Sequence, residues 1–352
     1  MEPVPAGHEP REDMIITENI PLKMHTTFRI GGPARYFANV ATVDEIRQAV
    51  SFAQERHLPF FVLGGGSNVL LPDEGFPGVI IKIELKGRTV ENLNDDTVRY
   101  VASAGENWDD VVSDTVSKNL WGLENLSNIP GTVGAAPIQN IGAYGRQVGD
   151  VIEYVDILDT DSMKTVRLSK DECGFSYRES VFKKADGKKW IVIGVSFFLE
   201  RVSNPVLSYH GLRHFKSYGA EELSPGQIRD AVIALRKEKL PDINVIGTAG
   251  SFFKNPLVSK EKLAELKKIK PEIVYNPDQD GNFKLSGAYL LDAIGGWKGF
   301  RAGDAGVYDK HALVLVNYGN ASTRDIVALK EMIINDMRKK TGITFEPEVE
   351  IV

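Results

Sequence analysis

The segment GTAGSFFKNP, residues 247–256, places one hydroxyl between a glycine and two phenylalanines, with Lys254 and Asn255 directly behind it. The Gly-x-Ser-x-Gly pattern of many serine hydrolases is absent, because Phe253 stands where the second glycine belongs. A hydroxyl held beside aromatic rings could instead donate a proton as a general acid. A helix-capping serine or a serine in a buried turn explains Ser251 equally well on these residues alone.

A first glycine loop, LGGGSN at 63–68, interrupts two short apolar runs. It is not a Rossmann fingerprint, because Val69 occupies the place of the third glycine, and no Gly-Lys-Ser/Thr follows to make a Walker loop. The pattern favours strand, turn, strand, with backbone N–H groups that could form an anion nest. A plain β-turn is the alternative.

A second glycine loop, IPGTVGAAPIQNIGAYG at 129–145, is too rich in glycine for a regular element and too apolar for a disordered linker. Its small residues would let a ligand approach the backbone closely, and Asn140 and Tyr144 offer polar contacts. Two such loops suit a ligand with a pyrophosphate and a flat ring system, such as a dinucleotide. Close packing of the loop on a sheet is the structural alternative.

Periodicity and capping signals predict the elements that position these loops. Capping boxes at Thr42/Glu45 and Ser224/Gln227 start two helices, the second with Pro225 at its first position. Four further helices are expected at 107–118, 259–269, 286–296 and 322–341. Strands are expected at 60–63, 69–71, 78–85, 97–105, 151–160, 189–200 and 344–352.

Composition narrows the class of protein. The chain has 352 residues, 42% of them hydrophobic, and a net charge of −6, which argues against a general nucleic-acid binder. The single Cys173 excludes an internal disulfide, and no third ligand lies near His210 and His214, so no metal site is expected. Without an apolar run of ~18 residues or a signal peptide, a cytoplasmic protein with no membrane insertion is expected.

Taken together, the motifs closely resemble the UDP-N-acetylenolpyruvoylglucosamine reductase (UDP-N-acetylmuramate dehydrogenase) family, in its type I form. HTTFRIGG, LGGGSN, IPGTVGAAPIQNIGAYG, SYRESVFK, KLPD, GSFFKNP, HALVLVN and PEV occur in the family's order across nearly the whole chain. The resemblance implies an α+β protein: a two-subdomain FAD-binding fold of the vanillyl-alcohol oxidase / p-cresol methylhydroxylase type plus a C-terminal α+β substrate-binding domain.

The resemblance also implies a catalytic set of Arg178, Ser251 and Glu348. In the family, NADPH reduces non-covalent FAD, which then passes hydride to the enolpyruvyl group of UDP-N-acetylglucosamine enolpyruvate in peptidoglycan synthesis. Arg178 and Glu348 would stabilise the charge on the substrate carboxylate, while Ser251 would protonate the adjacent carbon to give UDP-N-acetylmuramate. Glu350 stands where many relatives carry arginine, which removes a possible cation near Glu348.

Binding residues follow from the same resemblance. Those expected to contact FAD are Arg29, Gly64, Gly65, Gly66, Ser67, Asn68, Pro130, Gly131, Gly134, Ala135, Asn140, Gly142, Ala143, Tyr144, Gly145, Ile193 and Arg236. Those expected to contact the substrate are Tyr177, Tyr209, Lys239, Lys254, Asn255, Tyr275, Lys298 and His311.

The expected organisation is an N-terminal tail (1–19), two FAD-binding subdomains (20–86 and 87–202) and a substrate-binding domain (203–343). The terminal strand, 344–352, is expected to return near the flavin. Two other functions fit the same residues: another flavin-dependent oxidase or dehydrogenase of the same fold, or a non-catalytic module that binds a sugar nucleotide.

Overall fold

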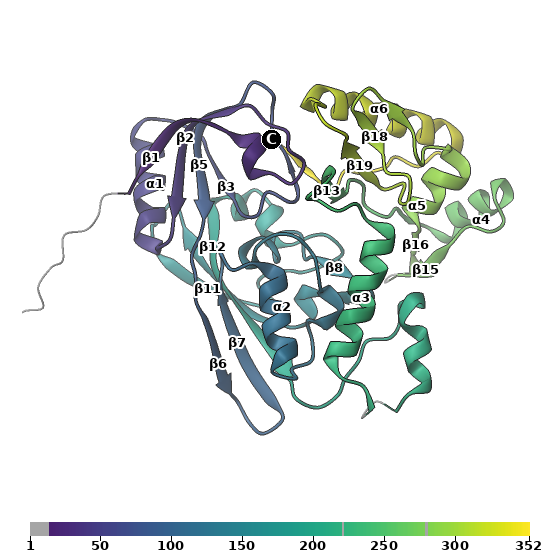
Figure 1. Ribbon diagram of the computed structural model, residues 1–352, viewed down its shortest axis with the longest axis horizontal. Helices are drawn as coiled ribbons and strands as arrows, with labels where there is room; N and C mark the ends of the chain where they lie inside the picture. The colour runs from purple at the N-terminus through teal and green to yellow at the C-terminus, as the bar shows by residue number, and fades with distance from the viewer. Residues whose placement is uncertain (1–13, 220–221, 279–280) are drawn as a thin grey trace, which may run out of the picture.

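Three main β-sheets follow one another along the chain and form the framework of the molecule (Figure 1). The computed structural model describes residues 14–219, 222–278 and 281–352. Helices and strands are mixed throughout, as the expected α+β class requires. Within the described part of the chain, no helix is both long and apolar enough to cross a membrane.

The first sheet has the strand order β1-β2-β5-β3 and ends at the first glycine loop. Its strands are β1 (Ile16–Pro21), β2 (Pro33–Val40), β5 (Phe76–Ile83) and β3 (Phe60–Leu63). A short 3-10 turn, η1 (Leu22–His25), follows β1. Helix α1 (Val43–Glu55) connects β2 to β3 and begins with the predicted capping box of Thr42 and Glu45.

The start of the chain differs from the expected tail of 1–19. Strand β1 already begins at Ile16, and Thr17 pairs with Phe37 of β2 in an antiparallel register. The tail is therefore shorter than expected, because backbone pairing with β2 orders the residues from Ile16 onward. Residues 1–13 lie outside the described part of the chain.

The second sheet is antiparallel, with the order β11-β10-β12-β7-β6. Its strands are β11 (Thr165–Ser169), β10 (Ile152–Asp159), β12 (Trp190–Glu200), β7 (Thr97–Ser103) and β6 (Arg88–Asn92). Helix α2 (Trp108–Ser117) is capped by Asn107, and the second glycine loop follows it. The short elements around that loop are η2 (Glu124–Leu126), η3 (Val133–Ala135), β8 (Gly142–Ala143), β9 (Arg146–Gln147) and η4 (Val148–Asp150).

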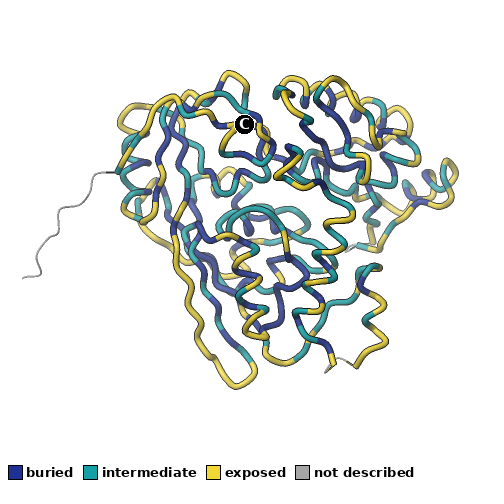
Figure 2. Tube along the Cα trace, in the orientation of Figure 1, coloured by how far each residue is buried: buried dark blue, intermediate teal, exposed yellow. Residues whose placement is uncertain are grey.

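Apolar side chains of the first two sheets share one core. Ile46 of α1, Val79 of β5, Tyr100 of β7, Val111 of α2 and Phe197 of β12 all belong to this core and are fully buried. Figure 2 shows the buried chain running through these strands, while β6 is exposed along its length. The shared core makes the two sheets a single support for both glycine loops.

The C-terminal part of the chain builds a second core on two small antiparallel sheets, and Phe28, Ile30 and Leu70 from the first part of the chain belong to it. The larger is β13-β19-β18-β17: β13 (Gly247–Ser251), β19 (Val314–Asn317), β18 (Ala305–Val307) and β17 (Arg301–Ala302). The smaller is β14-β16-β15: β14 (Leu257–Val258), β16 (Phe283–Leu285) and β15 (Tyr275–Pro277). Helices α4 (Lys260–Ile269), α5 (Gly287–Leu290), the π-helical turn η10 (Leu291–Gly295) and α6 (Thr323–Thr341) surround them.

Helix α3 (Pro225–Lys239) lies beside α2 instead of on the C-terminal sheets (Figure 1). It begins with the predicted capping box of Ser224 and Gln227. Its buried Ile228 and Val232 pack with Trp121, next to η2. The connecting segment 203–224, with the 3-10 helix η7 (His210–Ser217), adds Leu212 and Leu223 to this cluster. The domain boundary expected at 203 therefore divides residues that pack in one cluster, with Trp121 on one side and Leu212, Leu223, Ile228 and Val232 on the other.

One ion pair joins α3 to α2. Both guanidinium Nη atoms of Arg229 donate to the Asp109 carboxylate, at 2.6 and 2.8 Å, and the Asp109 Oδ1 atom also accepts the backbone N–H of Asn128. The Arg229 side chain is only 14% exposed. Breaking this pair would leave a partly buried carboxylate without its cation, which is costly.

We predict that Arg229→Met lowers the free energy of unfolding by about 2 kcal/mol, because hydrogen bonds to charged groups are worth roughly 1.5–3 kcal/mol. Arg167→Met is the matched control: Arg167 also makes two hydrogen bonds to one carboxylate, on Asp156, but its side chain is 59% exposed. Its loss should stay below about 1 kcal/mol. Equal losses in urea unfolding of the two variants would contradict the role of burial.

Candidate active site

Arg178 lies in a tight turn of the loop that follows β11. Ser176 and Glu179 exchange both backbone hydrogen bonds, at 3.0 and 3.2 Å, so Tyr177 and Arg178 form the tip of a four-residue turn. Arg178 has φ +57°, in the left-handed region that residues with a side chain rarely adopt. Such strain persists only where the surroundings hold it, and it concentrates at functional sites.

Glu348 reaches the same place on the C-terminal tail of the chain. Its backbone N–H donates to the Phe252 carbonyl at 2.7 Å, and its carbonyl accepts the Asn68 side-chain N–H at 3.2 Å. Beyond it, β20 (Glu350–Ile351) pairs in parallel with β4 (Val69–Leu70), directly behind the first glycine loop. The tail therefore runs between the C-terminal sheet and the first glycine loop. Of the strand expected at 344–352, only Glu350–Ile351 forms one, because only these residues pair with β4.

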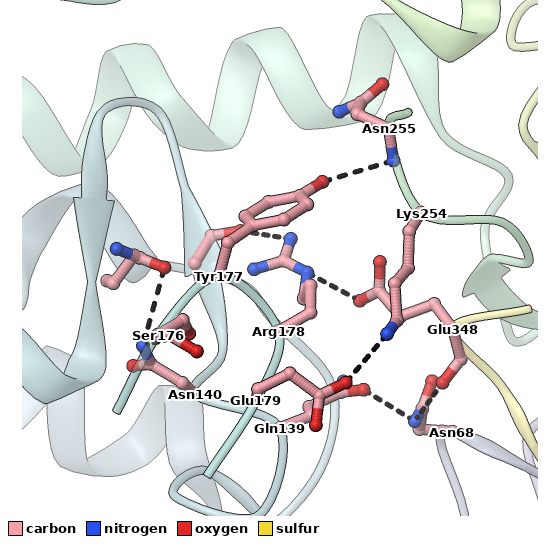
Figure 3. Close-up of polar contacts among 12 residues, drawn as sticks. Asn68, Gln139, Asn140, Ser176, Tyr177, Arg178, Glu179, Lys254, Asn255 and Glu348 are labelled. Carbon is pink, nitrogen blue, oxygen red and sulfur yellow. Dashed lines mark hydrogen bonds and ion pairs between the residues drawn. The ribbon is translucent and has the colours of Figure 1, made fainter. Parts of the chain in front are cut away.

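Arg178 and Glu348 form a buried ion pair (Figure 3). The Arg178 Nε and Glu348 Oε1 atoms lie 2.8 Å apart, and the two side chains are 16% and 10% exposed. The N–H of Nε is nevertheless not aligned with an acceptor, while Nη2 donates to the Gly142 carbonyl at 2.8 Å. A buried donor without an aligned partner is rare in proteins and can serve an incoming carboxylate.

Ser251 lies at the end of β13, one residue before the contact that fixes Glu348. The pairing of β13 with β19 shifts register between Thr248 and Ser251, and such bulges re-aim side chains next to active sites. Gly250, within the shift, has φ +77° and faces open space. The bulge therefore leaves room beside the half-buried Ser251 for another molecule.

The two glycine loops pack on one another. A Cβ on Gly65 would lie 2.7 Å from the Gly131 Cα atom, and one on Gly64 would lie 2.6 Å from the Thr132 Oγ1 atom. The Ser67 hydroxyl donates to the Pro130 carbonyl at 2.8 Å. Close packing is thus one reason for these glycines, although the contact joins loop to loop instead of loop to sheet.

A pocket of about 370 Å³ opens beside the first glycine loop. It is lined by Met24, His25, Thr26, Thr27, Arg29, Gly65, Lys82, Ile243 and Asn244. Burial lowers the pKa of Lys82, and burial with the neighbouring Lys82 lowers the pKa of His25. Hydroxyls, two cationic side chains and a glycine backbone in one hollow fit the phosphates of a dinucleotide.

Sequence reasoning missed His25 and Lys82. The HTTFRIGG segment contributed to the resemblance, but nothing in its local pattern assigned a ligand contact to His25. Lys82 is a single lysine in an apolar strand, and only the fold places its Nζ atom against the Gly64 carbonyl. The expected ligand residue Arg29 uses its guanidinium on the Ile243 and Val245 carbonyls.

Several expected flavin contacts are engaged within the protein. Asn140 is 2% exposed; its amide donates to the Ser176 carbonyl at 2.9 Å and accepts the Gly149 N–H, which ties the second glycine loop to the Arg178 turn. Arg236 donates to the Asn128 carbonyl. Gly134 packs on Ala104. The second glycine loop itself contains Ala135, Ala143 and Gly145, and β12 contains Ile193.

A second group of expected substrate residues lies at the C-terminal end of α3: Tyr209, Lys239 and His311. The Lys239 Nζ atom donates to the Tyr209 hydroxyl at 3.2 Å, and the Tyr209 ring packs edge-on against Tyr144 of the second glycine loop. Burial raises the pKa of Tyr144 to about 12. Burial and the nearby charge of Lys239 lower the pKa of His311 to about 4. The structure thus brings together three expected substrate residues beside an expected flavin residue.

Of the other expected substrate residues, Tyr177, Lys254 and Asn255 lie at the Arg178 turn, while Tyr275 and Lys298 have partners elsewhere in the C-terminal part of the chain. Asn255 donates its backbone N–H to the Tyr177 hydroxyl at 3.1 Å, next to the ion pair of Arg178 (Figure 3). Lys254 binds the Glu179 carboxylate at 2.7 Å. Tyr275 accepts a hydrogen bond from Lys267, and Lys298 pairs with Asp292.

His311 predicts a pH dependence of stability. Because the folded protein holds it neutral, its contribution is complete above the unfolded pKa of 6.5 and is lost as the pH falls toward 4. Between pH 7.5 and 5 this loss is at most about 2 kcal/mol. We expect urea unfolding at the two pH values to show a smaller difference for His311→Gln than for wild type. The exposed His214→Gln should keep the wild-type difference; the same difference in all three proteins would contradict the role of His311.

Two parts of the chain match models of known protein families. The model of the UDP-N-acetylenolpyruvoylglucosamine reductase C-terminal domain matches residues 241–352, and that of an FAD binding domain matches residues 34–169. A crystal structure of the MurB reductase from Thermus caldophilus covers 96% of this chain and 98% of its own, with 26% identity and a TM-score of 0.66. These matches confirm the expected fold, an FAD-binding fold followed by a C-terminal α+β domain.

Curated relatives agree over almost the full length. The UDP-N-acetylenolpyruvoylglucosamine reductase of Pseudomonas putida is 42% identical over 334 residues, which cover 94% of this chain and 97% of that protein. The corresponding protein of Pseudomonas aeruginosa is 40% identical over 95% of this chain and 98% of its own. At this identity over nearly the full length of both proteins, the chain belongs to the UDP-N-acetylenolpyruvoylglucosamine reductase family.

Proposed function

We propose that this protein reduces UDP-N-acetylglucosamine enolpyruvate to UDP-N-acetylmuramate in peptidoglycan synthesis, with FAD as bound cofactor and NADPH as hydride donor. Family membership supports the reductase activity and the FAD site. The type I form of the family and the choice of NADPH belong to the proposal. The reaction adds a hydride and a proton across a carbon–carbon double bond and leaves the carboxylate intact.

The observation that carries the proposal is the Arg178–Glu348 pair. Its guanidinium is held from one side by the Gly142 carbonyl, while Nε remains a buried donor without an aligned acceptor. Arginine presents a planar fork of donors that matches a carboxylate, so it suits an enolpyruvyl substrate. As hydride adds to the methylene carbon, negative charge moves toward that carboxylate. Donors already in place there stabilise the transition state.

Ser251 is the proposed source of the proton that completes the reaction. Its strand is bulged, and Gly250 leaves open space beside it. Because Phe252 accepts the N–H of Glu348, Ser251 is tied through one residue to the carboxylate-binding pair. We infer that its hydroxyl donates a proton to the carbon next to the substrate carboxylate, which yields the lactyl ether.

The cofactor residues fit an FAD held non-covalently. The pocket formed by His25, Lys82 and the Gly65 backbone suits the pyrophosphate. In the second loop, Gly142 contacts Arg178 and Tyr144 packs against Tyr209. When bound, FAD accepts hydride from NADPH and makes it available to the substrate. The chain's own part is to hold the cofactor, position the carboxylate and supply the proton.

The uridine diphosphate is assigned to the side of Tyr209, Lys239 and His311. Lys239 supplies a positive charge for phosphate, and Tyr209 offers a ring and a hydroxyl on a segment that precedes η7. We infer that this segment covers the nucleotide, as the type I resemblance implies. Asn255 contacts the Arg178 turn through its hydrogen bond to Tyr177, and we assign it to the substrate on the same resemblance.

An absorbance assay on the purified protein tests the proposed function. We expect a flavin spectrum that NADPH bleaches and that UDP-N-acetylglucosamine enolpyruvate restores under anaerobic conditions. A flavin that is bound and reduced, but not reoxidised by this substrate, would overturn the assignment. Turnover of an alcohol or phenol with oxygen and without NADPH would favour another flavin oxidase. A colourless protein that binds the UDP-sugar would favour a non-catalytic module.

We predict that Ser251→Ala leaves flavin reduction by NADPH within about twofold of wild type. Reoxidation by the substrate should slow by at least about 100-fold, because general acid catalysis contributes roughly 10²–10⁴-fold. Ser162→Ala, on an exposed turn, is the control and should match wild type in both half-reactions. Stopped-flow absorbance measures both steps; equal slowing of both would contradict the role of Ser251 as proton donor.

A further inference from the structure

The residues on both sides of Arg178 contact one short segment, 252–256, which connects β13 to β14 of the C-terminal sheets. Tyr177 accepts the backbone N–H of Asn255 at 3.1 Å, and the Glu179 carboxylate binds the Lys254 Nζ atom at 2.7 Å. Figure 3 shows these contacts flanking the Arg178–Glu348 pair. Two successive residues of this connecting segment, Lys254 and Asn255, thus hold the two neighbours of the proposed carboxylate-binding arginine.

The turn at Arg178 requires such support. A residue with a side chain at φ +57° costs free energy relative to glycine, and an isolated turn would relax. Lys183 supports the turn from within the same loop. Its Nζ atom donates to the Arg178 carbonyl and to Glu179 Oε1, both at 3.0 Å. The Glu179 carboxylate is therefore the common partner of a lysine within its own loop and a lysine from the C-terminal sheets.

The Glu179–Lys254 contact is charged and partly shielded from water. The Lys254 side chain is 17% exposed and that of Glu179 is 41% exposed. Burial alone would lower the pKa of Lys254, but the carboxylates of Glu179 and Glu346 outweigh it and raise that pKa. Glu346 is the weaker partner, because its oxygen is 3.5 Å from the lysine and its side chain is 72% exposed.

We propose that Glu179 is a positioning residue: through Lys254 it latches the Arg178 turn onto the C-terminal sheets, so that the guanidinium is held for the substrate carboxylate. This inference rests on the proposed function. It also gives Lys254 a different task from the one expected from the sequence, since a lysine that neutralises Glu179 is not free for a diphosphate. The uridine diphosphate is then left to the Tyr209 and Lys239 side.

Glu179→Gln tests the latch, because it removes the charge and keeps the shape of the side chain. We expect flavin reduction by NADPH to stay within about twofold of wild type. Reoxidation at saturating UDP-N-acetylglucosamine enolpyruvate should slow about tenfold, which corresponds to about 1.4 kcal/mol. A residue that only stabilised the fold would change both half-reactions together. Reoxidation at the wild-type rate would overturn the proposal.

Glu346→Gln is the matched control, since it removes the distant, exposed carboxylate from the same lysine. It should match wild type in both half-reactions. Lys254→Met breaks the latch from the other side and should reproduce the loss of Glu179→Gln, while the double variant should lose no more than either single variant. Lys254→Arg, which keeps charge and reach, should restore most of the rate. If Glu179→Gln does not fold, Lys254→Met carries the same test.

Substrate affinity separates the two tasks of Lys254. We expect calorimetric titration of the oxidised protein to give a dissociation constant for the UDP-sugar within about threefold of wild type in Lys254→Met. A tenfold weaker binding in Lys254→Met with unchanged binding in Glu179→Gln would assign Lys254 to the diphosphate and overturn the latch. Failure of the wild-type protein to be reoxidised by this substrate would instead contradict the proposed function.

Discussion

The ion pair of Arg178 and Glu348 depends on contacts from all parts of the chain. Its arginine is held in a strained turn by the second glycine loop through Asn140 and Gly142. Its glutamate is held on the C-terminal tail by Phe252 and by Asn68 of the first glycine loop. Burying one acidic and one basic group together costs free energy of desolvation unless their geometry is well fixed. The three sheets and the parallel pairing of β20 with β4 provide that fixed geometry.

The same contacts connect the two glycine loops to the segment that carries Glu348. Asn68 Nδ2 contacts the Gln139 side chain as well as the Glu348 carbonyl, so one amide connects both glycine loops and the tail. Gly65 and Gly131 bring the two loops into backbone contact. A cofactor placed along these loops would lie against the elements that hold the Arg178–Glu348 pair. We infer that loop packing and cofactor binding are two uses of the same glycines.

Local features of the fold were predictable from sequence, because neighbouring residues create them. The capping boxes at Thr42 and Ser224 are confirmed, and the helix expected at 322–341 is found as α6. The position of α3 was not predictable, because it depends on contacts between residues far apart in the sequence. Its apolar face packs with Trp121, and its Arg229 pairs with Asp109 of α2. For the candidate site, the family resemblance predicted Arg178, Ser251 and Glu348 as the catalytic residues. The His25–Lys82 pocket and the Glu179 partner of Lys254 depend on contacts that only the folded chain creates.

Glu348→Gln tests the central claim most directly, because it keeps the side-chain shape and removes the charge that pairs with Arg178. The decisive measurement is anaerobic stopped-flow reoxidation of the NADPH-reduced protein by UDP-N-acetylglucosamine enolpyruvate. If the Glu348 carboxylate holds the Arg178 guanidinium in place for the substrate carboxylate, flavin reduction should match wild type while reoxidation falls by at least about 100-fold. Reoxidation at the wild-type rate would contradict the claim that the Arg178–Glu348 pair is the chemical centre of this protein.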